Sequence, residues 1–216
     1  SELIVKNDEE IINILLPCIP KEVESHFGDW TGRNRFALNL ERACVDLIKK
    51  ANSNLIKRNP DQFLQIYQKY MGKGYHIFNE FILEGLEKLP VKYSDYVIKY
   101  LCSNFEQNIF DESSGNLDEL LVTKKILQKH ACMCKDTVFK ELEKKIYYYK
   151  EKDVVNLYKG IREDKLNYKW KKMLWDCWGN IQIELFPYLP YERLSVKAKQ
   201  LYDVLKRKFD NGSKLY

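Results

Sequence analysis

The sequence predicts an all-α fold of stacked helical hairpins, an α-solenoid of TPR- or HEAT-like repeats. Apolar residues recur at steps of three and four along almost every segment, which is the pattern of amphipathic helices. No segment alternates with the period of two that indicates a strand. The 9 glycines and 6 prolines in 216 residues are too few for a sheet protein with many tight turns. Because each helix offers a single apolar stripe, the helices have to pack side by side, and an irregular helical bundle is the alternative arrangement.

Three helices are predicted in the N-terminal part of the chain, and the second is a short one with Val23 and Phe27 before the break at 28–32. Asn7 is placed to cap a short helix that Pro17 and Pro20 end, because proline lacks the backbone N–H that a helix needs. A longer helix is predicted from Asn34 to the next proline, with one face apolar for about six turns. The residues of this apolar face are Phe36, Leu40, Ala43, Leu47, Ala51 and Leu55.

The middle of the chain continues the same pattern. Three further helices are predicted between residues 61 and 101, separated by glycines and a proline. The segment 108–116, NIFDESSGN, has the turn formers and acidic residues of an exposed loop, so we place a candidate internal boundary near 104–116. Helical spacing resumes over residues 117–127, and Asp136 is placed to cap the helix after that.

The C-terminal part contains the clearest predicted hairpin. One amphipathic helix is predicted with the apolar stripe Trp170, Leu174, Cys177, Ile181 and Leu185. Pro187 and Pro190 stop this helix, and Ser195 is placed to cap the next one. The next helix is predicted to bury Ala198, Leu201, Tyr202, Leu205 and Phe209. The hairpin therefore has its turn between residues 186 and 195.

A weak internal repeat favours stacked hairpins over an irregular bundle. Ile82-Leu83, followed by Pro90 and a helix, resembles Ile126-Leu127, followed by the break at 132–135 and a helix. The offset of 44 residues between Ile82 and Ile126 lies within the range of long helical-hairpin repeats, roughly 34 to 47 residues.

The composition indicates a globular protein. The 36 basic and 31 acidic residues leave a net charge of +5, which does not by itself indicate a nucleic-acid partner. The six cysteines are scattered, and no apolar run reaches the roughly 20 residues of a membrane span, so we expect a cytoplasmic protein with reduced thiols and no membrane partner. Because the chain starts at Ser1 without a methionine, we expect residues 1–216 to be a single helical-repeat module from a larger protein.

The nearest sequence to a metal cluster is His130 with Cys132 and Cys134. A structural zinc site normally has four ligands with paired spacing, and only three lie together here. On a helix His130 and Cys134 share a face, whereas Cys132 points elsewhere. We interpret the segment as a helix end with buried thiols and a surface histidine, and we expect no metal.

Signatures of catalysis are weak throughout the chain. His76 and Glu80 lie four residues apart, but such a pair is far more often an ordinary surface contact. Gly72-Lys73-Gly74 lacks the earlier glycine, the hydroxyl and the preceding strand of a phosphate loop, so we read it as a helix end and turn. We therefore expect no enzyme activity and no cofactor in this chain; a helical enzyme that uses His76 and Glu80 is a distant alternative.

Two surface features could serve recognition. Three successive tyrosines at 147–149 are spread around a helix, so at least one should be exposed. The best basic patch is the polar side of the last helix, where Lys169 and Lys172 could join its cations. The residues of the helix patch are Lys197, Lys199, Lys206 and Arg207. A solvated helix face is its default interpretation, and nucleic-acid binding is the alternative.

One segment carries a resemblance to a known family. Residues 185–195, LFPYLPYERLS, are preceded by Trp178-Gly179 and followed by a helix that ends with Lys206-Arg207-Lys208-Phe209. This segment resembles a recurring one in the helical-repeat region of large bacterial STAND NTPases, in particular the antiviral members that sense phage proteins. The run 78–101, with ILEGLEKLP and YVIKYL, resembles helix pairs of the same region.

The resemblance implies a ligand-sensing array in antiphage defence. Its expected partners are a phage structural or packaging protein and the rest of the parent chain. The phosphate loop and the N-terminal effector of the family have no counterpart in these 216 residues. The resemblance therefore implies that NTPase and effector chemistry belong to other regions of a parent protein, and it provides no catalytic residue.

Overall fold

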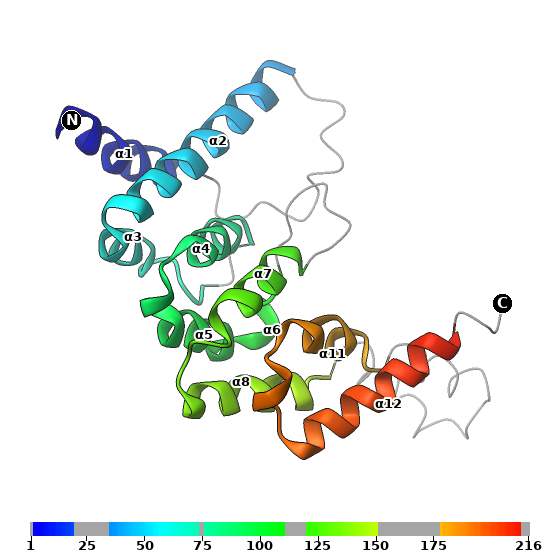
Figure 1. Cartoon of the computed structure of the whole chain (residues 1–216). Coiled ribbons are helices and arrows are strands. Elements are labelled where there is room, and N and C mark those ends of the chain that lie inside the picture. Colours follow the sequence, from blue (N-terminus) through cyan, green and yellow to red (C-terminus); the bar gives the residue numbers. More distant parts are fainter. Residues whose placement is uncertain (1, 20–34, 74–75, 111–119, 151–177, 213–216) are drawn as a thin grey trace. The chain divides into compact units, whose positions relative to one another are not determined.

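The computed structural model describes residues 2–19, 35–73, 76–110, 120–150 and 178–212, and every regular element in these ranges is helical (Figure 1). The predicted all-α class is confirmed. The chain divides into two compact units, residues 1–133 and 134–216. The predicted boundary segment 104–116 falls inside the first unit. Within the described ranges, no helix combines the length and the apolar character of a membrane span.

The first unit contains seven of the described α-helices and two 3₁₀ turns. They are α1 (Glu2–Leu15), η1 (Leu16–Cys18), α2 (Arg35–Arg58), α3 (Pro60–Tyr67), α4 (His76–Lys88), η3 (Val91–Tyr93), α5 (Ser94–Ser103), α6 (Phe105–Asn108) and α7 (Leu121–His130). The described elements of the second unit are α8 (Asp136–Tyr148), α11 (Asn180–Leu185), η4 (Phe186–Tyr188), η5 (Tyr191–Arg193) and α12 (Val196–Gly212).

Helix α1 ends where the sequence predicts but starts earlier. Pro17 lies in the turn η1 directly after the helix, as expected. The predicted cap at Asn7 is wrong, because α1 already begins at Glu2 and Asn7 lies inside it. The next residue, Asp8, forms an ion pair with Arg58 of α2, so this part of α1 is held by a contact that is distant in sequence.

Helix α2 is confirmed, but its buried face differs from the predicted one. Ala43 is exposed and Leu47 keeps 47% of its surface exposed, whereas Ile48 is fully buried. The helix packs against α1, α3 and α4, so its buried side is broader and rotated relative to a single stripe. This side includes Ile48, Ala51, Asn52, Leu55 and Ile56.

The core of the first unit is aromatic where α3 meets α4. Phe63 and Tyr67 of α3 and Phe78 of α4 are fully buried, and Tyr70 stacks on Phe78 with 4.5 Å between ring centroids. Gly85 lies inside α4, where glycine normally costs helix stability. A Cβ at this position would lie 2.1 Å from Cζ of Phe63, so the glycine is required by the close approach of the ring.

A partly buried polar network holds the short helix α6 in place. Tyr100 donates a hydrogen bond to Oδ1 of Asn79 (2.8 Å), and the Asn79 amide donates to the carbonyl oxygens of Gln107 and Phe110. Asn108 donates to the carbonyl of Tyr100 (2.7 Å). Two of these bonds satisfy carbonyl groups near the end of α6 that have no partner within the helix.

The breaks between helices share a corner conformation. After α4, the Leu89 N–H donates a hydrogen bond to the carbonyl of Leu86 (3.2 Å). After α11, the Leu189 N–H donates in the same way to the carbonyl of Phe186 (3.1 Å). Proline follows in both cases, at positions 90 and 190. Lys135, before α8, adopts almost the same backbone angles as Pro90, with φ −60° and ψ 151° against −59° and 151°. This is a local likeness, and the stacking of hairpins into a repeat array stays a prediction.

In the second unit, the predicted helix with a stripe from Trp170 to Leu185 is wrong in its last part. Gly179 has φ +87°, which no α-helix accommodates, and α11 begins only at the following residue. The break allows close packing, because a Cβ on Gly179 would lie 2.3 Å from Cδ2 of Leu205 in α12. The part of the stripe from Trp170 to Cys177 lies outside the described residues.

The start of α12 is as predicted. Ser195 Oγ accepts a hydrogen bond from the Ala198 N–H (3.2 Å), which is the N-cap contact. Of the residues predicted to be buried, Ala198 and Leu205 are fully buried, whereas Leu201, Tyr202 and Phe209 are only half-buried. The predicted cap Asp136, by contrast, is the first residue of α8, and Lys135 occupies the cap position without a side-chain bond.

Candidate functional site

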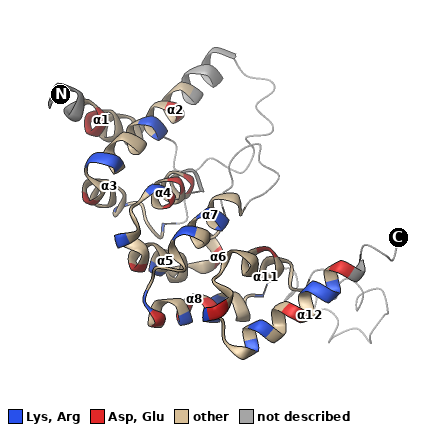
Figure 2. Cartoon of the chain, in the orientation of Figure 1, with Lys and Arg blue, Asp and Glu red and all other residues tan. Residues whose placement is uncertain are grey.

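The predicted basic patch lies along α12, where Figure 2 shows basic residues with acidic residues between them. Lys197 and Arg207 are exposed. Lys199 and Lys206 are seven residues apart and therefore share one flank of the helix, whereas Lys197 lies on the opposite flank. Lys169 and Lys172 lie outside the described residues.

The cations on the first flank rest on tyrosine rings. Nζ of Lys199 lies 5.0 Å from the ring centroid of Tyr191, and Nζ of Lys206 lies 4.0 Å from that of Tyr202. Tyr202 in turn packs against the buried ring of Phe186, with 5.5 Å between centroids. Each cation is attracted by the electron density of the ring face, so these lysines are partly ordered.

The opposite flank repeats this chemistry with other residues. Lys208 lies over the rings of Trp178 (5.6 Å) and Phe209 (4.4 Å), and its ammonium group donates to the carbonyl of Trp178. Sequence reasoning missed these aromatic partners. The pair of Tyr202 and Lys206 could have been predicted from the sequence, because residues four apart are neighbours on a helix surface.

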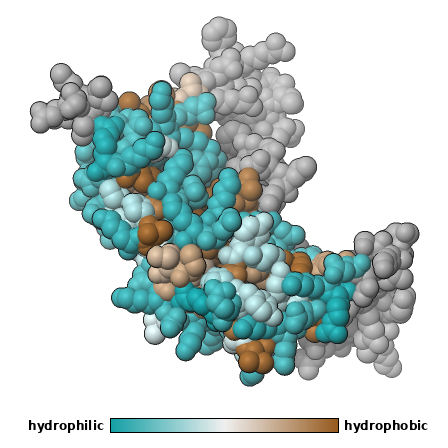
Figure 3. All heavy atoms as spheres, viewed as in Figure 1, coloured by the Kyte–Doolittle hydropathy of each residue, from teal (hydrophilic) through white to brown (hydrophobic). Residues whose placement is uncertain are grey.

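Apolar side chains are exposed between the cations. Val196 keeps 71% of its surface exposed, Tyr191 keeps 49% and Val204 keeps 40%. Figure 3 shows a mostly hydrophilic surface on the described residues, with hydrophobic residues in small separate patches. The combination of aliphatic and cationic side chains on one helix is therefore a distinct surface feature of the second unit.

The start of α12 is fixed firmly to α8. Arg193 donates to the carbonyl of Cys134 and to Oδ1 of Asp136, both at 2.8 Å, and its guanidinium lies 4.4 Å from the ring centroid of Phe139. The backbone N–H of Ser195 donates to Oε2 of Glu143 (2.7 Å). These contacts connect the start of α12 to α8.

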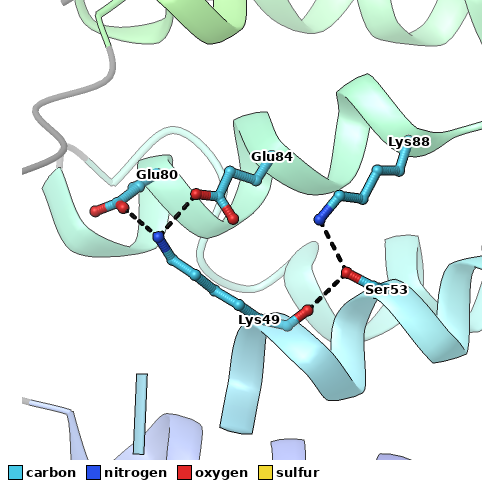
Figure 4. Close-up of polar contacts among 5 residues, drawn as sticks. All are labelled: Lys49, Ser53, Glu80, Glu84 and Lys88. Atoms are coloured by element: carbon cyan, nitrogen blue, oxygen red, sulfur yellow. Dashed lines mark hydrogen bonds and ion pairs between the residues drawn. The ribbon is translucent and has the colours of Figure 1, made fainter. Parts of the chain in front are cut away.

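A second polar cluster joins α2 to α4 in the first unit (Figure 4). Nζ of Lys49 lies 2.6 Å from Oε1 of Glu80 and 2.7 Å from Oε1 of Glu84. Burial by itself would lower the pKa of Lys49, but the hydrogen bonds and negative charges of both carboxylates outweigh it and raise this pKa. Lys88 donates a further hydrogen bond to Ser53 Oγ (2.8 Å). The Ser53 hydroxyl in turn donates to the carbonyl of Lys49. The cluster is a clamp between two helices, with its lysine held in the charged form.

This clamp includes Glu80, which the sequence analysis paired with His76. Glu80 is buried and bonded to Lys49 of another helix, so its carboxylate already has a cationic partner. His76 is the first residue of α4, and its side chain lies outside the described part. The structure therefore assigns Glu80 a structural contact.

The interpretation of His130 as a surface histidine is wrong. The side chain is fully buried at the end of α7, and its Nδ1 lies 2.9 Å from Oγ of Ser94. Of the two cysteines beside it, Cys134 is buried and Cys132 is exposed. Among the described residues, no group of three possible metal ligands converges. The helix end reaches the core because α7 packs against both α4 and α5.

Burial controls the chemistry of His130. The hydroxyl of Ser94 donates to the carbonyl of Val91 (2.7 Å), and its oxygen also contacts Nδ1 of His130. The histidine Nε2 is buried and makes no hydrogen bond of ordinary geometry, although backbone groups of Leu86 and Glu87 near the ring favour its protonated form. Burial, with a smaller effect from the charge of Lys129, lowers the pKa of His130 to about 4.

Three other features of the sequence remain: the glycine turn at 72–74, the three tyrosines at 147–149 and the cysteines. Gly72, with φ +71°, follows α3 in a turn, as expected for a helix end. Of the three tyrosines, Tyr148 keeps 63% of its surface exposed and meets Tyr147 edge to face, so the expected exposure is confirmed. The described cysteines form no disulfide, and Cys102 and Cys134 are buried whereas Cys18 and Cys132 are exposed.

Comparison with known proteins does not assign the chain to a family. No protein-family model matches its sequence, and no curated protein or solved structure is significantly similar to it.

Proposed function

We propose that this chain is a non-catalytic helical module that binds a protein partner. The observation that carries the proposal is the contrast between buried and exposed groups. The buried titratable groups Glu80 and His130 are engaged in contacts between helices. Aliphatic and aromatic side chains stay exposed on helix surfaces, above all Val196, Ile14 and Tyr148. Exposed apolar groups on a rigid helix are typical of protein recognition.

The arrangement of the module and its biological setting are further parts of the proposal. The corner shared by the breaks after α4 and α11 supports stacked helical hairpins, which would present an extended binding surface. The resemblance of residues 185–195 supports the sensor region of a STAND NTPase in antiphage defence. There, binding of a phage protein would favour the active state of the parent and so shift its equilibrium.

Affinity capture tests the protein-binding function. The immobilised chain is incubated with purified phage structural and packaging proteins, and retained proteins are identified by mass spectrometry after nuclease treatment. We expect retention of at least one protein that survives the nuclease. If none is retained, while the parent protein still triggers defence against the same phage, the proposal is wrong.

Nucleic-acid binding is the second candidate, and one observation favours it. The cations of α12 lie beside aromatic rings, a combination that single-strand binders use. Fluorescence anisotropy with single-stranded and duplex oligonucleotides tests it, because phosphate binding weakens steeply as salt is raised. Binding at low salt that disappears with added salt would support this candidate, and absence of binding at low salt would remove it.

A further inference from the structure

The outward side of α12 and the turn before it form one continuous surface, which we call the α12 outer face. Its residues are Tyr191, Val196, Lys199, Val204 and Arg207. The four helical members are three to eleven residues apart and fall within less than half of the helix circumference. Tyr191 joins them because the ammonium group of Lys199 lies over its ring. The face is therefore defined by the helix itself and by the contact between Lys199 and Tyr191.

The aliphatic members restrict the class of partner. Val196 and Val204 contribute to binding free energy only if a partner covers them with apolar atoms, because the burial of apolar surface is what makes such contacts favourable. A nucleic-acid backbone has no aliphatic groups of this kind. The rings of Tyr191 and Tyr202 are covered by lysines of the chain itself, which leaves them less available for base stacking.

The charged side chains on and beside the α12 outer face restrict the class of partner further. Lys199 and Arg207 each follow one of the valines by three residues on the outer face, and Lys197 and Lys206 lie beside this face. This excess of cations fits carboxylates on a partner. Asp203 lies within the same face, and its negative charge would repel a continuous row of phosphates, whereas separate carboxylates can avoid it.

We propose that the α12 outer face binds an acidic amphipathic helix of a partner protein. The apolar stripe of that helix covers Val196 and Val204, and carboxylates beside the stripe reach Lys199 and Arg207. Helix-on-helix recognition of this kind uses apolar anchors at steps of three and four with charges on the flanks. The hydrogen bonds of Arg193 keep the start of α12 in place, so little ordering is needed on this side. The proposal rests on the protein-binding function proposed above.

A synthetic peptide tests this directly. The probe is a fluorescent helical peptide of roughly 18 residues, about 27 Å long, with a leucine stripe flanked by glutamates. Its matched control has the same stripe flanked by lysines, and a single-stranded oligonucleotide is the third ligand. We expect the acidic peptide alone to bind the full chain, with an affinity that added salt reduces without abolishing, because only the charges are screened.

Variants of the chain locate the binding site. Val196→Ser with Val204→Ser should weaken peptide binding about tenfold, and Lys199→Glu with Arg207→Glu should remove it. The matched control is Lys140→Glu with Lys144→Glu, which reverses two exposed lysines of α8 and should change binding less than twofold. Circular dichroism of each variant confirms that the helices are retained.

Three results would overturn the proposal. They are an unchanged affinity in the valine variant, an equal loss in the α8 control, and displacement of the peptide by the oligonucleotide. The proposed function is judged separately by affinity capture. If the Lys199→Glu and Arg207→Glu variant still retains a phage protein, protein binding stands and the α12 outer face is not its site.

Discussion

Ser94 Oγ lies 2.9 Å from Nδ1 of His130, and this contact joins the first residue of α5 to the last residue of α7 inside the first unit. Three helices meet there, because α7 packs against α4 as well as α5. The histidine is neutral in the folded chain, since its pKa is lowered to about 4. The packing of this junction is therefore coupled to pH.

The first prediction concerns acid stability. The folded pKa of His130 lies below its unfolded value of 6.5, so the unfolded chain binds a proton that the folded chain excludes. This contribution to stability is complete above pH 6.5 and is lost as the pH falls towards 4, reaching a loss of about 2 kcal/mol near pH 4.5. Urea unfolding at pH 7.5 and 4.5 measures it. In His130→Asn, which keeps a polar group near Ser94, the fall between the two pH values should be smaller; an equal fall would contradict the prediction.

The second prediction concerns the clamp between α2 and α4. Lys49→Met leaves the carboxylates of Glu80 and Glu84 close together without their cation, and Glu80 is mostly buried. We expect a loss of roughly 2 kcal/mol in the free energy of unfolding, because an unpaired, partly buried charge is costly. Adding Glu80→Gln should restore part of the loss. The exposed neighbour Lys50→Met is the control, and a similar loss there would argue against the clamp.

Helix ends at prolines and the cap at Ser195 were accessible to sequence reasoning, whereas the predicted caps at Asn7 and Asp136 were wrong. The chemistry of an end is local: Pro17 and Pro187 lack an N–H, and Ser195 offers an oxygen to the free Ala198 N–H. The all-α class follows from apolar periodicity in the same way. The basic residues of α12 could likewise be placed on its polar side from their spacing alone.

Features that depend on a second helix could not be predicted. Leu47 and Ile48 are adjacent, and only the packing of α2 against three other helices decides that Ile48 is the buried one. His130 is buried because α7 ends against α4 and α5, which its own neighbours in sequence do not reveal. The ring of Tyr191 reaches Lys199 only after the corner at Pro190 has turned the chain.

The third prediction tests the contact between α3 and α4. Gly85→Ala would improve helix propensity by about 1 kcal/mol at an open site. Here the added Cβ would lie 2.1 Å from Cζ of Phe63, a side chain that is itself fully buried. We expect a net loss of roughly 2 kcal/mol in unfolding free energy, measured by urea titration. A stabilised variant would show that the ring can move aside.

A double-mutant cycle separates this clash from other effects. Phe63→Leu alone should destabilise the chain, because it removes buried aromatic volume. Combined with Gly85→Ala, it makes room for the added methyl group, so the two losses should sum to more than the measured loss of the double variant. Strict additivity would contradict a direct contact between the two positions.

The fourth prediction uses two glycines with the same backbone region and different surroundings. Gly72 has φ +71° and no atom within 4 Å of an added Cβ, whereas Gly179 has φ +87° and a Cβ there would lie 2.3 Å from Leu205. Gly72→Ala should therefore cost only the left-handed conformation, about 1 kcal/mol. Gly179→Ala should cost about that much plus the displacement of Leu205, roughly 3 kcal/mol in all. Thermal and urea unfolding of both variants measures the difference, and equal losses would show that α11 and α12 do not pack as closely at Gly179 as the backbone indicates.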